Sequence, residues 1–334
     1  MQENSKLSSS EISNLWTHYL RETMAICVSR HALITIKDKE IHAIFELALD
    51  MSRRHVENLV ELFNKESFPI PKGFSNEDVN LKAPPLFSDV FWLKYIHDMT
   101  MHGGQAFSLA FNVSIRQDIR NFYYQCNIDT MDLYNKSIEV LISKNLYDYP
   151  PSYLSTSKVN FIPTLDYVTD LIGQKRKTNS IESGNIFFNL KKSVMAKAII
   201  IGFKQVCKSN DVRQFLEKSL HTKNKHIMTF SSILSKDNLN FAKLLDTEIT
   251  NSTIPPFSDK LMAFHVGFLF SAAISYYGTA LIASMRADIA VLCEKAILED
   301  FMIYSRFGKL TINNKWLEQP PEADSRITLP FDTQ

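Results

Sequence analysis

The chain has 334 residues, of which 45% are apolar and 22% charged, with a formal net charge of +1. This is a globular composition with room for two domains, and the balanced charge provides no overall field to attract nucleic acid or an anionic membrane. The four cysteines lie far apart without Cys-x-x-Cys spacing, which favours reduced thiols. Because residues 1–6 also lack the apolar core of a signal peptide, we expect a cytoplasmic protein.

The first two predicted helices cover residues 8–35 and 40–63. Ser8 and Glu11 have the spacing of a capping box, and apolar residues recur at helical intervals in both segments. Residues 65–86 contain four prolines and cannot form a regular helix throughout. A connection of about 20 residues can cross the full height of a bundle, whereas a hairpin needs only a short turn. The connection therefore favours a ferritin-like crossover over an up-down-up-down bundle.

Two further helices are predicted after this connection. Ser88 or Asp89 caps the third, and residues 114–119 (SIRQDI) begin the fourth, which ends before Pro150. We expect Ser114 to cap the fourth helix, with Gln117 completing a capping box. Two residues of one helix that lie two apart do not face each other, so we expect Arg116 and Asp118 to have different partners. Arg116 would then tie the helix to a neighbouring helix end or to the crossover.

The second half of the chain repeats the first. Residues 284–289 (SMRADI) repeat 114–119, residues 257–259 repeat 87–89, and Pro320 repeats Pro150, all with an offset of 170. Such regular matches indicate a duplication. The sequence therefore predicts an all-α protein of two tandem ferritin-like four-helix bundles, each with a long crossover. The expected domains are residues 1–151 and 180–334, joined by a linker segment over 152–179.

One segment of the second half resembles a membrane span. Residues 263–284 contain no Asp, Glu, Lys or Arg, and their number fits a bilayer. The equivalent residues 93–114 include Lys94, Asp98 and two histidines. A duplicated fold would not place one copy in lipid and the other in water, so we expect a helix enclosed on most sides by protein and no membrane span.

The end of the second half also indicates a family. Residues 316–321 (WLEQPP), together with the Ser-x-Arg-x-Asp-Ile pattern, resemble an uncharacterised family of Bacillus-type bacteria. Its members carry two tandem ferritin-like bundles and are distantly similar to spore coat protein F. The resemblance covers about residues 8–326, although the first copy keeps only the prolines of the closing motif. It implies a fold and a spore or stress context, but no established reaction and no active-site residues.

Metal ligands receive little support from the spacing of histidines and carboxylates. A di-iron site needs Glu-x-x-His on two helices, and the chain contains no such motif, so we expect no metal cofactor. The best remaining candidates are Asp98 and His102, which share one helical face beside His97. Their counterparts Phe268 and Ala272 cannot bind metal. A polar cluster that faces solvent or the crossover is therefore the preferred interpretation.

His55 and His226 are the only histidines at equivalent positions of the two copies. They are either ligands or acid–base groups, or imidazoles packed near the end of a helix and hydrogen-bonded to the crossover. We favour packing, because we identify no carboxylate partner that recurs with them.

Motifs of catalysis are also missing from the sequence. It has no Gly-x-Ser-x-Gly elbow and no glycine-rich phosphate loop, so we assign no catalytic, cofactor-binding or metal-binding residue. The favoured function is that of a non-catalytic structural or interaction protein of the spore-coat-like type, with protein partners or self-association. The alternative is a small-molecule-binding or metal-binding ferritin-like protein, or an unrecognised enzyme, with a site inside or between the bundles.

Overall fold

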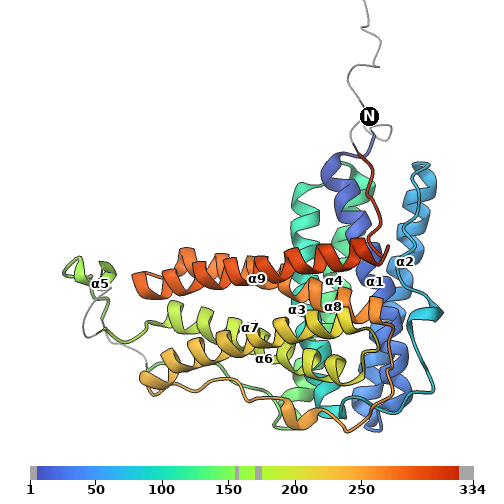
Figure 1. The fold of residues 1–334 in the computed structure, drawn as a ribbon. Coiled ribbons are helices and arrows are strands. Elements are labelled where there is room, and N and C mark those ends of the chain that lie inside the picture. Colours follow the sequence, from blue (N-terminus) through green and yellow to red (C-terminus); the bar gives the residue numbers. More distant parts are fainter. Residues whose placement is uncertain (1–5, 155–157, 170–174, 323–334) are drawn as a thin grey trace, which may run out of the picture.

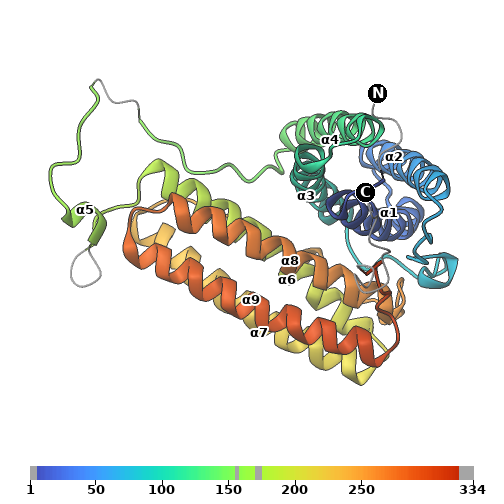
Figure 2. The same cartoon turned by 90° about the horizontal axis from the view of Figure 1, so that it is seen from above.

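The computed structural model describes residues 6–154, 158–169 and 175–322, and these parts of the chain are helical without a β-strand. Two four-helix bundles cross one another (Figures 1 and 2), which confirms the predicted all-α fold of two repeated halves. A short helix, α5 (Asp166–Thr169), comes between them in the sequence. The first bundle contains α1 (Ser9–Thr35), α2 (Lys39–Lys65), α3 (Asp89–Val113) and α4 (Gln117–Ser143). The second contains α6 (Ser180–Val206), α7 (Asn210–Lys236), α8 (Asp259–Ala283) and α9 (Ala287–Asn313).

The connection between α2 and α3 runs the full length of the first bundle. At the end of α2, Lys65 contacts Asp118 at the start of α4, with 3.2 Å between Nζ and Oδ2. At the opposite end, the Asp89 carboxylate accepts two backbone N–H groups of the α1–α2 turn, at 3.0 and 2.8 Å. Asp259 makes the same contacts with the α6–α7 turn. Both bundles therefore have the predicted crossover.

A buried glutamate closes the corner where α1 meets α4. Glu11 forms the predicted capping box with Ser8, and its Oε1 also accepts the backbone N–H of Arg116 at 2.9 Å. Glu182 accepts the backbone N–H of Arg286 at 2.9 Å in the second bundle. In each bundle, one carboxylate thus satisfies unpaired N–H groups at the starts of two helices.

The repeated six-residue motif lies at this corner, but its side chains differ from the prediction. Ser114 is the C-cap of α3 and donates its hydroxyl hydrogen to the carbonyl of Ala110 at 2.7 Å, so the N-cap and capping box predicted there are wrong. Arg116 is the N-cap of α4 and has extended backbone. Its guanidinium therefore reaches Asp118 with two hydrogen bonds of 3.1 and 2.6 Å, contrary to the expectation for two residues within one helix. Arg116 also pairs with Glu66 at the end of α2, at 2.7 Å, as predicted for a neighbouring helix end.

The two crossovers pair with each other between the bundles. Isolated antiparallel bridges join Val79 to Phe257 and Phe87 to Ile249. The Phe87 ring packs on Gly202 of α6, where a Cβ atom would lie 2.6 Å from the ring. A side chain at position 202 would displace this ring, so the glycine permits the close approach of the two bundles.

Hydrogen bonds between side chains reinforce this pairing in a reciprocal way. Ser88, the N-cap of α3, donates to Glu248 of the second bundle at 2.5 Å. Ser258, the N-cap of α8, donates to Asp78 of the first bundle at 2.6 Å. Each bundle thus places a carboxylate at the positive end of a helix in the other.

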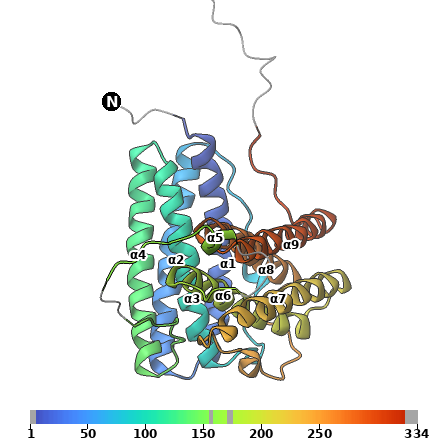
Figure 3. The same cartoon turned by 90° about the vertical axis from the view of Figure 1, so that its left-hand side faces the viewer.

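Equivalent residues of α3 and α8 touch each other where one bundle lies across the other, an arrangement that Figure 3 shows from the side. The Tyr95 hydroxyl lies 3.2 Å from Nε2 of His265, and Gln105 donates to the Ser275 hydroxyl at 3.2 Å. The residues of each pair are 170 positions apart. The bundles are therefore related by a pseudo-two-fold axis that passes between α3 and α8.

Among the described helices, α8 alone has the length and hydropathy to cross a membrane. In this structure it packs inside the second bundle, where Phe264, Phe270 and Tyr277 are buried. These contacts agree with the prediction of a helix enclosed on most sides by protein.

The serine–carboxylate exchange can be tested at Ser258. We expect S258A to lower the free energy of unfolding by about 1–2 kcal/mol, because α8 loses its N-cap and Asp78 loses a donor. Urea unfolding followed by circular dichroism measures this change. The control is S232A, since the Ser232 hydroxyl bonds only within its own helix. Equal stability of the two variants would contradict the proposed contribution.

His265 makes the stability of the interface depend on pH. Burial lowers the pKa of this imidazole from 6.5 to about 4. The folded state therefore holds it neutral, and its contribution to stability is lost as pH falls below 6.5 towards the folded pKa. Between about pH 7 and about pH 5, we expect the wild type to lose about 2 kcal/mol more than H265Q in urea unfolding. The same acid sensitivity in both proteins would contradict this assignment.

Candidate functional site

A polar cluster lies in the core of the first bundle, near the midpoints of its helices. Oε1 of Glu22, on α1, is 2.9 Å from His18 Nε2 and 3.0 Å from His55 Nδ1 on α2. The other His55 nitrogen is 3.2 Å from Oδ2 of Asp129 on α4. Cys126 lies one turn before Asp129, and ligand atoms of His18, His55 and Cys126 all lie within 4.8 Å of one another. Three helices thus bring imidazole, carboxylate and thiol groups together away from solvent.

The charges in this cluster depend on one another. Burial opposes the charge on Glu22, but hydrogen bonds from His18 and His55 outweigh burial and hold the pKa of this carboxyl well below its usual value. Burial lowers the pKa of His18. Burial also disfavours a charge on His55, but Glu22 and Asp129 more than compensate and raise its pKa. Burial raises the pKa of the Cys126 thiol. The cluster therefore favours an ionised Glu22, a positive charge on His55 and a protonated thiol.

The second bundle holds a different cluster at the same level. Lys223 donates to Oδ2 of Asp300 at 2.7 Å, and both side chains are buried. His226 lies between Glu299 and the Tyr277 hydroxyl, at 3.1 and 3.2 Å. Burial raises the pKa of Asp300 to about 6 in spite of the lysine, and burial lowers the pKa of Lys223. This cluster contains its own buried cation.

The two clusters share only an imidazole and a carboxylate. His55 corresponds to His226, and Asp129 corresponds to Glu299. The other members differ, so each cluster has its own chemistry. The remaining equivalent pairs, first bundle before second, are His18 and Asn189, Glu22 and Ser193, Ser52 and Lys223, Cys126 and Ala296, and Thr130 and Asp300.

The predicted packing of His55 and His226 is wrong in two respects. Both lie well inside their helices and bond to carboxylates of the fourth helix of their bundle, not to the crossover. A carboxylate does recur with them, at positions 129 and 299. Alignment of the two copies along the fourth helix contains this signal, because Asp and Glu are chemically equivalent there.

The structure does not bring the other candidate metal ligands together. Asp98 faces Lys192 of α6, with 3.5 Å between Oδ1 and Nζ. His102 Nδ1 lies 2.6 Å from the Tyr276 hydroxyl of α8. His97 bonds instead to a serine of α4 at 3.1 Å. These side chains thus serve contacts between and within the bundles. His97 and Asp98 are buried there, so the expectation of a polar cluster facing solvent or the crossover is wrong.

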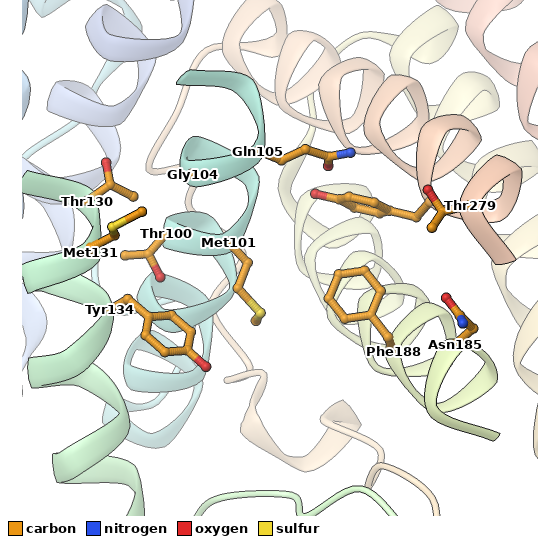
Figure 4. Close-up of a pocket in the computed structure, with 11 residues that line it drawn as sticks. Thr100, Met101, Gly104, Gln105, Thr130, Met131, Tyr134, Asn185, Phe188 and Thr279 are labelled. Carbon is orange, nitrogen blue, oxygen red and sulfur yellow. The ribbon is translucent and has the colours of Figure 1, made fainter. Parts of the chain in front are cut away.

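A cavity of about 460 Å³ opens between the bundles (Figure 4). Its walls include Met101 and Gln105 of α3, Tyr134 of α4, Phe188 of α6 and Tyr276 of α8. None of its eleven lining residues carries a carboxylate, amine, imidazole or thiol. The cavity offers van der Waals contacts and hydrogen bonds, and it lacks the groups that most often serve as catalytic acids and bases.

Comparison with known proteins identifies the family. The profile of DUF3231, a protein family of unknown function, matches residues 1–159 and again residues 166–329. The chain belongs to this family. The double match agrees with the duplication and confirms the prediction of an uncharacterised family with two copies of one domain. No curated protein matches the chain.

One solved structure is similar to part of the chain. It is a protein of Bacillus halodurans C-125 that was provisionally assigned as a spore coat protein. The sequences are 18% identical, and the alignment covers 46% of this chain and 99% of the other, with a TM-score of 0.43. The length of that protein thus corresponds to about one half of this chain.

The buried ion pair of the second bundle gives a test of its energetics. We expect K223M to lower stability by about 3–5 kcal/mol, because it leaves the Asp300 carboxyl buried without its partner. The double variant K223S/D300T introduces the residues of the first bundle and removes both charges, so it should recover most of the loss. Urea unfolding measures both effects. The control K225M removes an exposed lysine and should cost less than about 1 kcal/mol, and a cost for K223M within that range would contradict the expectation.

Proposed function

We propose that the chain is a non-catalytic structural protein that associates with a second copy of itself through the outer face of α9. The contacts common to both bundles support a structural role, since they hold helices together at the Glu11 and Glu182 corners and at the Ser88 and Ser258 caps. The polar clusters, in contrast, differ between the copies. A shared reaction would require shared reactive groups.

Five large apolar side chains are exposed along one side of α9. Helical spacing places all five within an arc of about 100° around the helix axis. At the equivalent positions of α4, Asn121 replaces Val291 and Asp132 replaces Met302. The other three equivalents, Ile128, Met131 and Ile142, are apolar, so the apolar face is complete only on α9. Its members and their exposed fractions are Val291 (53%), Leu298 (58%), Phe301 (59%), Met302 (60%) and Ile312 (62%).

The order of residues on this face suits an antiparallel copy of the same helix. Glu294 and Lys309 are exposed at equal distances on either side of the midpoint between Phe301 and Met302. A two-fold axis at this midpoint places Glu294 of each copy opposite Lys309 of the other, so two such pairs form. Opposite charges in register favour this partner and orientation, and two-fold dimers are the commonest oligomers.

A charge at the centre of the face tests the association. We expect the wild type to form dimers in light scattering, and M302D to raise the dimer Kd at least tenfold, because two aspartates then approach each other near the axis. The control is M228D, since Met228 is 72% exposed on α7 and lies outside the face. A wild type that stays monomeric up to its solubility limit refutes the proposal.

Exchange of the flanking charges tests the antiparallel register. Either E294K or K309E alone places like charges opposite each other and should weaken the dimer, whereas E294K/K309E restores opposite signs and should recover it. A double variant no tighter than the single ones would refute this register.

A further inference from the structure

The polar cluster of the first bundle contains the donor set of a metal site. His18, His55 and Cys126 are buried, and their ligand atoms lie within 4.8 Å of one another. Glu22 adds a carboxylate oxygen next to both imidazoles. We propose that this cluster binds one divalent cation of the zinc class through His18, Glu22, His55 and Cys126. Imidazole, thiolate and carboxylate are the ligands that zinc prefers.

The two distances from Glu22 to the imidazoles are close to those between donors of a tetrahedral site. Oε1 of Glu22 is 2.9 Å from His18 Nε2 and 3.0 Å from His55 Nδ1. Metal bonds of about 2.0–2.1 Å to nitrogen and oxygen place neighbouring donors about 3.3 Å apart in a tetrahedron. The Cys126 sulfur lies within 4.8 Å of a ligand atom of each imidazole, and a Zn–S bond of about 2.3 Å draws it towards the same shell. Binding releases to solvent the thiol proton and the proton on His55 Nδ1, because the thiolate and the neutral imidazole are the ligands.

Asp129 prepares His55 for this role. Its carboxylate lies 3.2 Å from His55 Nε2 and, on its solvent side, 3.5 Å from Arg54. An N–H group at Nε2 directed to Asp129 leaves Nδ1 of the same ring free to face Glu22 and the metal. Carboxylate–histidine–metal arrangements of this kind fix the tautomer and orientation of metal ligands.

The core of the second bundle holds a cation of its own, the side chain of Lys223, at the same level along the helices. There the ammonium group of Lys223 sits against Asp300 at 2.7 Å, in the core. Ser52 occupies the equivalent position of the first bundle and carries no charge. Carboxylates in a core need a compensating positive charge. In the first bundle a bound cation supplies it in place of the proton on His55, as Lys223 does in the second. This inference is independent of the association through α9, which uses no residue of the cluster.

Metal titration of the full chain tests the site. After removal of metal with a chelator, we expect the wild type to bind one equivalent of Zn²⁺ in calorimetry and to gain thermal stability. With Co²⁺ as the probe, we expect a thiolate-to-cobalt absorption band. H18N and C126A introduce the residues of the second bundle and should each weaken binding at least tenfold, and C126A should abolish the band. D129N should weaken binding about 10–100-fold and keep the band.

Matched cysteines make the test selective. C293A removes a buried cysteine of the second bundle and should change neither affinity nor the cobalt band. If C126A does not fold, C126S takes its place in the cobalt experiment, and C126S should also lose the band. A wild type without one equivalent of bound metal overturns the proposal without reference to any variant. So does a cobalt band that persists in folded C126A or C126S.

Discussion

The reciprocal contact between the crossovers determines how the two halves of this molecule fit together. Each long connection would otherwise be an irregular segment on the surface of its own bundle. Paired with its counterpart, it satisfies backbone groups and places Asp78 at the start of α8 and Glu248 at the start of α3. The same contact fixes the crosswise arrangement of the bundles and brings α3 and α8 together at the pseudo-two-fold axis.

Compensation of charge is the second constraint, and the two bundles meet it differently. A four-helix bundle that buries carboxylates near its midpoint must also hold positive charge there. The second bundle does so with Lys223, whose amine contacts both Asp300 and the face of the Phe270 ring. The first bundle has Glu22 between two imidazoles. The fold thus tolerates different chemistry at one level, because the caps and corners that define it lie at the helix ends.

The helices and crossovers could be predicted because both leave patterns that are local in sequence. Each pattern occurs within one segment: apolar periodicity, capping residues and a proline-rich connection. The duplication repeats each pattern in the second half of the chain. The start of α4 could not be predicted in the same way. Its carboxylate acceptor is a distant residue, Glu11, and Ser114 caps the end of α3 instead. The cluster of the first bundle could not be predicted for a related reason. Its donors come from three helices, so no spacing along the chain records that Glu22 and His55 meet.

The pseudo-two-fold axis also explains why the copies could diverge. Contacts such as Tyr95 with His265 have the form of an isologous interface, in which equivalent residues of two subunits meet. In one chain the two sides of each contact are encoded separately, so they can change independently. Arg21 of α1 thus lies over the ring of Phe268, whereas its counterpart Lys192 faces Asp98. Joining the halves also makes their association intramolecular, so the interface tolerates such differences. Duplication therefore preserves the frame of this protein and leaves the interior of each bundle free to acquire its own ligands.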